Sequence, residues 1–205
     1  MERKVAIVTG GSRGIGAATA KCLGQDGWAV AVNYVNSEQA AQEIAAAVVA
    51  AGGEAIAVQA DTASEPDVER MFSEVETKWG RLDALVNNAG IVGPRGKLEA
   101  LTVDAVERVL AVNVTGYILC ARAVNSLTIG LSQEVAGVGI RVNAVAPGLT
   151  RTDMPNPTVL ETAGPSIPIG RIGEAEEIAE GIVWLMSDKA SYVAGANLRI
   201  AGGRP

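Results

Sequence analysis

The sequence of 205 residues contains no histidine. This absence excludes nucleophilic catalysis by serine–histidine or cysteine–histidine pairs, and it excludes metal sites built on histidine ligands. The two cysteines, Cys22 and Cys120, fit no metal-binding spacing and are expected to be reduced core thiols of a cytoplasmic protein. Aromatic residues make up only 3% of the chain, so the core must consist mainly of valine, isoleucine, leucine and alanine.

Basic residues are also in short supply. The chain has 17 Lys and Arg against 23 Asp and Glu, a net charge of −6, and its cations form no cluster. Binding to nucleic acid needs clustered cations, and an acidic chain gains little from an anionic membrane. The apolar run behind residues 1–4 is too short for a signal peptide or a membrane span. We therefore expect one globular cytoplasmic domain, residues 1–205, with neither nucleic acid nor a membrane as partner.

Apolar runs and helical periods alternate through the first half of the chain. Strands are predicted at residues 5–9, 28–32, 55–58 and 82–86, with helices at 15–23, 37–51 and 64–79 between them. The strands lack polar alternation, which is typical of a parallel sheet covered by helices on both faces. Ser64-x-x-Asp67 predicts a capping box, and the proline-rich stretch 147–168 predicts a long irregular loop.

The alternation fails in the second half. Helical patterns at 102–122 and 126–135 are separated by only three residues, and a strand pattern follows at 140–146. Each earlier helix is followed by a strand, because a parallel crossover returns to the sheet after each helix. One strand is therefore missing where the pattern requires it.

Residues 9–16, TGGSRGIG, join the first strand to the first helix. Gly10 permits a tight turn, Gly14 lets the backbone approach a pyrophosphate, and Gly16 allows close helix–strand packing. The N–H groups and dipole of the helix N-terminus favour phosphate. The position after a strand and before a helix predicts a dinucleotide-binding loop, although the glycine spacing alone would also suit a simple turn.

The end of the second predicted strand bears on the choice of cofactor. An NAD-binding protein would place Asp or Glu there, on the ribose 2′-hydroxyl, but this chain has Asn33 followed by Tyr34. A neutral side chain does not repel a 2′-phosphate, and Arg13 could pair with one; the alternative for Arg13 is a solvated loop cation. We predict that NADP(H) is preferred over NAD(H).

These features, with several later motifs, resemble the short-chain dehydrogenase/reductase family of single-domain Rossmann folds. The resemblance covers nearly the whole chain and rests on TGxxxGIG at 9–16, Asp61, NNAG at 87–90, Asn113 in VNV, Pro147-Gly148 with Thr150 and Thr152, and Gly195 with Gly202-Gly203 near a C-terminal subunit contact. The candidate cofactor-binding residues are then Gly10, Ser12, Arg13, Gly14, Ile15, Gly16, Asn33, Tyr34, Asp61, Thr62, Asn87, Ala89, Gly90, Pro147, Gly148, Thr150 and Thr152.

The resemblance also implies roles for individual residues. Asp61 would hold the adenine, residues 87–90 would support the sheet beside the cofactor, and residues 147–152 would meet the nicotinamide. Asn113 would be catalytic, as a helix-kinking member of a proton relay. The alternatives are turn or cap chemistry for Asp61 and for the asparagines at 87 and 88, and a purely structural Asn113.

The implied activity is hydride transfer between a nicotinamide and a small carbonyl or secondary alcohol, in a homo-oligomer expected to be a tetramer. Family members complete the relay with a Ser and with a Tyr four residues before a Lys, whose charge favours the phenolate. No tyrosine of this chain has that lysine: the fourth residues after Tyr34, Tyr117 and Tyr192 are Glu38, Ala121 and Ala196.

The Ser, Tyr and Lys are expected between Val124 and Leu127, where one strand and part of the following helix, roughly 30–40 residues, are missing. Either the chain truly lacks them, as an inactive nucleotide-binding relative or a deletion product would, or the intact protein carries a segment that this sequence omits. We favour the second explanation, because a doubly wound sheet without a central strand leaves unpaired backbone. Ser126 could be a remnant of the lost region and is assigned no catalytic role.

Overall fold

The computed structural model describes residues 3–94, 101–123 and 136–203. The predicted order of strands and helices up to residue 86 is confirmed, with ends shifted by one or two residues. The helices and strands are β1 (Val5–Val8), α1 (Gly14–Gln25), β2 (Ala29–Tyr34), α2 (Glu38–Ala50), β3 (Glu54–Gln59), α3 (Glu65–Trp79), β4 (Ala84–Val86), α4 (Val103–Leu110), α5 (Gly116–Ala123), β5 (Ala144–Pro147), β6 (Thr150–Arg151), α7 (Pro157–Thr162), β7 (Gly173–Glu174), α8 (Ala175–Met186) and β8 (Asn197–Ile200).

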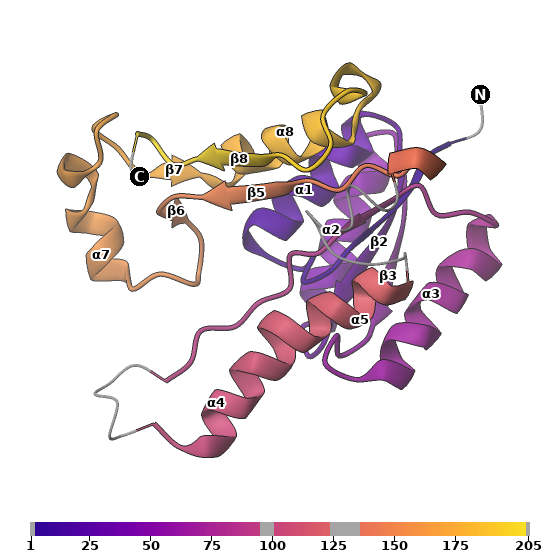
Figure 1. Ribbon diagram of the computed structural model, residues 1–205, viewed down its shortest axis with the longest axis horizontal. Coiled ribbons are helices and arrows are strands. Elements are labelled where there is room, and N and C mark those ends of the chain that lie inside the picture. The colour runs from indigo at the N-terminus through magenta and orange to yellow at the C-terminus, as the bar shows by residue number, and fades with distance from the viewer. Residues whose placement is uncertain (1–2, 95–100, 124–135, 204–205) are drawn as a thin grey trace.

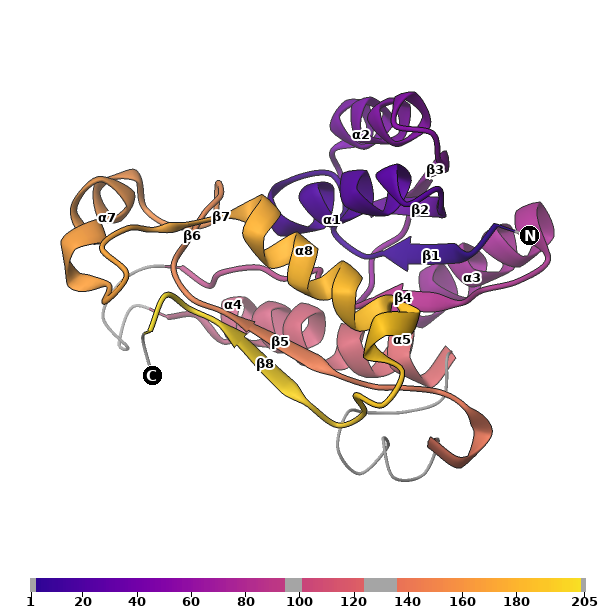
Figure 2. The ribbon, with the colours of Figure 1, turned by 90° about the horizontal axis from the view of Figure 1, so that it is seen from above.

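The main sheet has four parallel strands in the order β3-β2-β1-β4 (Figure 1). Because side chains alternate along a strand, β1 contributes to two cores. Ala6 and Val8 pack with residues of α1, α2 and α8, while Val5 and Ile7 pack with residues of α3 and α5. Figure 2 shows α1 and α2 on one side of the sheet and α3 and α5 on the other. The predicted doubly wound α/β fold is confirmed.

The sheet is interrupted beyond β4. Strand β5 pairs with β8 in a separate parallel sheet, and within the described ranges no strand pairs with the outer edge of β4. The four residues of β1 and the six of β2 are all buried, whereas no residue of β5 is. Helix α8 packs along α1 and also contacts β5 and β8 (Figure 2). The predicted gap between Val124 and Leu127 and the helix predicted at 126–135 lie outside the described residues.

The helical stretch predicted at 102–122 is confirmed as a continuous rod. Its middle, Ala111–Thr115, is π-helical and joins α4 to α5. The Thr102 side chain caps α4 by accepting a hydrogen bond from the N–H of Ala105 (3.3 Å). None of the helices in the described ranges is long and apolar enough to cross a membrane.

Two local predictions are wrong. Ser64 is the N-cap of α3, but its side chain makes no capping hydrogen bond. The Asp67 carboxylate, expected to complete the box, accepts instead from the N–H of Asp61 (2.9 Å) and from Arg70 (2.7 Å). The stretch 147–168 is not irregular throughout: it contains β6 and α7. Asn156 caps α7 by accepting from the N–H of Thr158 (3.0 Å), and Pro157 occupies the first turn, where proline is tolerated.

Asp83 links the start of β1 to the turn before β4. Its ionisation makes the stability of the fold depend on pH. Its carboxylate accepts hydrogen bonds from the N–H of Val5 (2.8 Å) and from Arg81 (2.6 Å). Partial burial raises the pKa of the carboxyl, but the Arg81 and Val5 hydrogen bonds outweigh that effect and hold the pKa below its ordinary value of 3.8. Folding therefore favours the charged form, so this stabilisation is present above the ordinary pKa and is lost as the pH falls through the lowered one.

We expect Asp83→Asn to lower the free energy of unfolding at pH 7 by about 1 kcal/mol, because a charge-assisted hydrogen bond is replaced by weaker neutral ones. Urea unfolding at pH 7 and at pH 3 measures the effect. The difference from the wild type should shrink at pH 3, and an equal difference at both values would contradict the linkage.

Candidate cofactor and active site

The glycine-rich loop between β1 and α1 has the geometry of a phosphate cradle. Gly10 and Gly14 have φ values of +61° and +55°, in the left-handed region that glycine adopts without strain. A Cβ on Gly16 would lie 2.5 Å from the Gly10 carbonyl oxygen. Arg13, the N-cap of α1, is exposed, Ser12 is half-buried, and Ile15 packs against Ala18 and its neighbours. Close backbone and a helix N-terminus fit a bound pyrophosphate.

Two asparagine side chains bind the backbone N–H and carbonyl of Gly10. The Gly10 N–H donates to Asn33 Oδ1 (3.2 Å), and the Gly10 carbonyl accepts from Asn88 Nδ2 (3.2 Å). Asn88 Nδ2 also donates to the Thr9 carbonyl (2.9 Å). The turn that begins the loop is therefore fixed by side chains from β2 and from the segment after β4.

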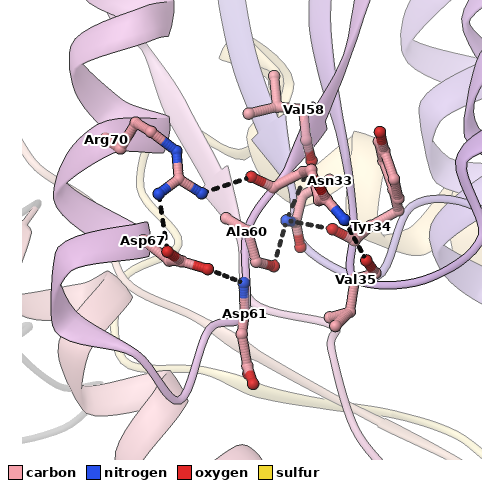
Figure 3. A network of polar contacts seen from close by, with 9 residues as sticks. Asn33, Tyr34, Val35, Val58, Ala60, Asp61, Asp67 and Arg70 are labelled. Atoms are coloured by element: carbon pink, nitrogen blue, oxygen red, sulfur yellow. Dashed lines mark hydrogen bonds and ion pairs between the residues drawn. The ribbon is translucent and has the colours of Figure 1, made fainter.

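The side chain of Asn33, predicted at the cofactor ribose, is bound by backbone groups of the protein, and its contact with the ribose stays a prediction. Only 1% of Asn33 is exposed, and its Nδ2 donates to the carbonyls of Val58 (3.3 Å) and Ala60 (2.9 Å), as Figure 3 shows. Strand β2 runs on to Tyr34, which is itself buried in the core, and the first exposed residue after the strand is Val35. Through these hydrogen bonds and the one to the Gly10 N–H, the Asn33 side chain supports the loop.

Asp61 and Thr62 follow β3 and face the rod formed by α4 and α5. Asp61 Oδ1 accepts a hydrogen bond from the N–H of Ala63 (3.0 Å). Asp61 Oδ2 forms an ion pair with Arg108 (2.9 Å). Thr62 is buried, and a Cβ on Gly116 would lie 3.0 Å from its hydroxyl oxygen. The turn chemistry considered for Asp61 is thus present, and its contact with adenine stays a prediction.

The NNAG segment is anchored to β1 by a hydroxyl. Thr9 Oγ1 accepts hydrogen bonds from the N–H groups of Asn88 (2.9 Å) and Ala89 (3.0 Å), and it donates to the Val86 carbonyl (3.2 Å). Asn87 Nδ2 donates to the Tyr117 carbonyl (3.2 Å) on α5. The segment therefore joins the glycine loop on one side to the helical rod on the other.

Asn113 lies within the π-helical turn and binds the backbone of a single residue. Its Oδ1 accepts from the Ile91 N–H and its Nδ2 donates to the Ile91 carbonyl, both at 2.9 Å. A Cβ on Gly90 would lie 3.6 Å from Asn113 Oδ1, so the two residues are neighbours. A π-turn is a local departure from the α-helix that often marks functional positions. The observed contacts are structural, and a place in a proton relay stays a prediction.

The segment 147–152 reaches the glycine loop from the β5–β8 sheet. The Gly148 N–H donates to the Ile200 carbonyl (2.9 Å), which continues the pairing of Pro147, and the Thr150 hydroxyl donates to the Gly148 carbonyl (3.0 Å). The Thr152 methyl group lies 3.3 Å from the position that a Cβ on Gly14 would occupy. The predicted nicotinamide and pyrophosphate segments thus meet in the folded chain.

The tyrosines do not complete an active site. Tyr34 is in the core and Tyr192 is fully exposed. Burial raises the pKa of Tyr117, with a smaller contribution from Cys120, whereas a proton-transferring tyrosine needs a lowered one. In the described part of the chain, no group of three or more Cys, Asp or Glu is placed to hold a metal.

Comparison with known proteins decides the family. A family model described as short chain dehydrogenase matches residues 4–125, and one described as enoyl-(acyl carrier protein) reductase matches residues 122–204. The chain belongs to the short-chain dehydrogenase/reductase family. The uncharacterized oxidoreductase YgfF of Escherichia coli K12 is 42% identical over 245 aligned residues, which cover 98% of this chain and 99% of YgfF.

Similar solved structures include complexes with nicotinamide cofactors. A short-chain dehydrogenase from Burkholderia cenocepacia in complex with NADP is 32% identical, with a TM-score of 0.90 and 98% of each chain covered. A 3-ketoacyl-(acyl-carrier-protein) reductase from Brucella melitensis complexed with NADH is 28% identical, with a TM-score of 0.91, and the match covers 99% of this chain and 98% of that one. Both kinds of nicotinamide dinucleotide thus occur among dehydrogenases that this chain resembles.

The alignment with YgfF also shows that YgfF has additional residues within the matched region. The 245 aligned residues of the YgfF match exceed the 205 residues of this chain by 40, so YgfF carries residues that have no counterpart here. The two family models meet at residues 122–125, beside the predicted gap.

Sequence analysis missed some residues that build the site. Thr9 lies inside the TGxxxGIG motif, but nothing in the spacing shows that its hydroxyl would fasten the segment after β4. Arg108 is an isolated cation on an exposed helix face, and its pairing with Asp61 joins positions 47 residues apart. Only the packing of the rod against β3 reveals that contact.

Proposed function

We propose that this dehydrogenase-family chain is the cofactor-binding framework of an NADP(H)-dependent oxidoreductase that interconverts a carbonyl and a secondary alcohol. The observation that carries the proposal is the glycine loop at the N-terminus of α1, fixed by Asn33 and Asn88 and contacted by Thr152. A bound nicotinamide would supply or accept the hydride. Around it, the glycine loop would bind pyrophosphate, Asp61 the adenine, and residues 147–152 the nicotinamide portion.

The proposed cofactor preference depends on charge at the end of β2. No acidic residue stands between Asn33 and Ser37, and the first carboxylate is Glu38. Arg13 is exposed and lies two residues after Gly11, whose N–H donates to the Asn33 carbonyl (2.9 Å), and it forms no ion pair with any residue in the described ranges. These features support a site that accepts a 2′-phosphate.

We expect Arg13→Gln to raise the Kd for NADPH by about tenfold to a hundredfold, because a charge-assisted hydrogen bond is worth roughly 1.5–3 kcal/mol. The Kd for NADH should change little, since NADH lacks the phosphate. Fluorescence titration of both cofactors measures the two constants. Tighter binding of NADH than of NADPH by the wild-type protein would contradict the preference itself.

We further propose that the catalytic Ser, Tyr and Lys belong to a segment omitted between Val124 and Leu127, with Asn113 as the part of the relay present here. The longer relative, the junction of the family matches and the edge of β4 with which no described strand pairs support this placement. The absent Tyr-x-x-x-Lys favours a second candidate, an inactive nucleotide-binding relative that acts as a sensor or scaffold.

The intact mass of the purified protein separates these two candidates. A mass several kDa above 21.0 kDa, together with NADPH oxidation on a panel of carbonyl compounds, supports the enzyme. A mass of 21.0 kDa with NADPH binding but no turnover supports the inactive relative. The substrate class stays open among sugars, steroids, small alcohols and acyl thioesters, the last suggested by the name of the Brucella protein.

We also propose a cytoplasmic homo-oligomer, a tetramer by family resemblance. Cys22 and Cys120 are both free thiols, as in a reducing compartment. An exposed apolar stripe follows one face of the helical rod, formed by Val103, Val106, Leu110, Val114 and Ile118. Such a stripe suits a subunit contact. Light scattering should give a multimer that Leu110→Glu dissociates, and a monomeric wild type would contradict the proposal.

A further inference from the structure

Asn33 connects the ends of three strands. It lies at the penultimate position of β2, and its Oδ1 accepts from the N–H of Gly10 (3.2 Å), just beyond β1. Its Nδ2 donates to the carbonyl of Val58 (3.3 Å) in β3 and to that of Ala60 (2.9 Å) just beyond it. At 1% exposure the amide is almost fully buried, and these partners use both ends of the carboxamide. Figure 3 shows the Nδ2 side of this network.

This network reaches both halves of the proposed adenosine diphosphate site. On one side, Gly10 is the residue whose left-handed φ of +61° begins the phosphate loop, and Asn33 holds its N–H while Asn88 holds its carbonyl. On the other side, Ala60 directly precedes Asp61, whose own N–H is held by Asp67 (2.9 Å; Figure 3). The amide therefore sets the distance between the loop and the end of β3.

A carboxylate could not take the same position. Ionised Asp only accepts hydrogen bonds, so at position 33 it would face the carbonyls of Val58 and Ala60 without a proton to donate. A buried, unpaired charge is strongly unfavourable. The polar groups able to contact a ribose at this edge lie farther on, where Asn36 and Ser37 are exposed.

We infer that Asn33 is a positioning residue of the phosphate loop and takes no part in distinguishing NADP from NAD. It acts through Gly10 and Ala60, so its loss weakens both dinucleotides by the same factor. The inference rests on the proposed function only in requiring that a nicotinamide dinucleotide is the ligand.

The decisive variant is Asn33→Asp, the change that would favour NAD(H) if this side chain contacted the ribose. Isothermal titration with NADPH and with NADH should show at least a tenfold rise in Kd for both and an unchanged ratio of the two constants. Thermal unfolding should show a fall in Tm of roughly 5–10 °C. An Asn33→Asp protein that keeps its Tm and gains affinity for NADH relative to NADPH would overturn the inference.

Asn36→Asp is the matched control, because it adds the same charge at the same edge on an exposed residue outside the network. It should keep the wild-type Tm. An equal loss of Tm in this variant would assign the effect to charge alone and overturn the inference.

Asn33→Ser covers the case in which Asn33→Asp does not fold. Its hydroxyl keeps part of the network, and both Kd values should rise by one common factor of about ten. Unchanged Kd values with a lowered Tm would make Asn33 merely structural and would contradict a positioning role. A wild-type protein that binds neither dinucleotide would instead remove the proposed function, a distinct result.

Discussion

Replacing Gly16 by alanine is expected to abolish or strongly weaken binding of both NADPH and NADH. An added Cβ would lie 2.5 Å from the Gly10 carbonyl oxygen and from Asn88 Nδ2, closer than real contacts permit. The strain cannot be relieved by a side-chain rotation, because one of the two neighbours is backbone. Either α1 moves away from the loop or the Gly10 carbonyl turns away from Asn88, and both changes disorganise the phosphate cradle.

Overpacking of this kind costs about 1–3 kcal/mol, which corresponds to a factor of roughly 5 to 150 in affinity if the loop absorbs the strain. Fluorescence titration with NADPH and a thermal melt of the same sample measure both consequences. Gly137→Ala is the matched control: Gly137 has no heavy atom within 4 Å of an ideal Cβ and no left-handed φ. Normal NADPH affinity in Gly16→Ala would contradict the assignment of the loop.

The first four strands were predictable because each carries its own local signal. Short runs of β-branched and alanine residues end before glycines or polar residues, and a parallel sheet buries such runs on both faces. The sequence at 5–8 supplies side chains to both cores, as the clusters around Val8 and Ile7 show. The glycine loop was predictable for a similar reason. Gly10, Gly14 and Gly16 stand at positions where a left-handed φ or a close backbone approach leaves no room for a side chain.

The hydrogen-bond partners of polar side chains were not predictable from the sequence. The type of residue at position 33 correctly indicated a neutral strand end, but an amide at the end of a strand can face a ligand or the neighbouring strands. Here the amide binds Gly10, Val58 and Ala60, which come from other parts of the chain and give no signal in the sequence around position 33. Asp67 shows the same limit: its spacing from Ser64 suits a capping box, yet the tertiary neighbours Asp61 and Arg70 take its carboxylate.

The alternation of strands and helices fails after residue 123, and the sequence predicted one structural consequence of this failure. A missing strand predicts an unpaired edge and half-covered neighbours. Strand β4 has two half-buried residues of three, and β5 pairs only with β8 among the described strands. The arrangement of the β5–β8 pair could not be anticipated, because it depends on the packing of α8 against α1.

Supplying the segment proposed to lie between Val124 and Leu127 is therefore expected to have the largest effect on this chain. We expect that inserting, between Val124 and Leu127, the YgfF residues that have no counterpart here will raise the Tm and create NADPH-dependent reduction of carbonyl compounds where the 205-residue chain has none. The physical reasons are two. A new strand is expected to pair with the edge of β4 at which no described strand pairs, and the insert is expected to bring the Ser and the Tyr-x-x-x-Lys that the family resemblance implies for proton transfer.

A second insert separates the two effects. In it, the tyrosine of the Tyr-x-x-x-Lys is replaced by phenylalanine, which keeps the packing of the ring and removes only the hydroxyl. This protein should show the same rise in Tm and the same NADPH affinity, but turnover at least a hundredfold lower, the lower end of what a positioned acid or base contributes. Equal turnover by both inserts would place the proton transfer on a residue already present in this chain. An insert that raises neither Tm nor turnover would mean that β4 and β5 do not flank the position of the absent strand.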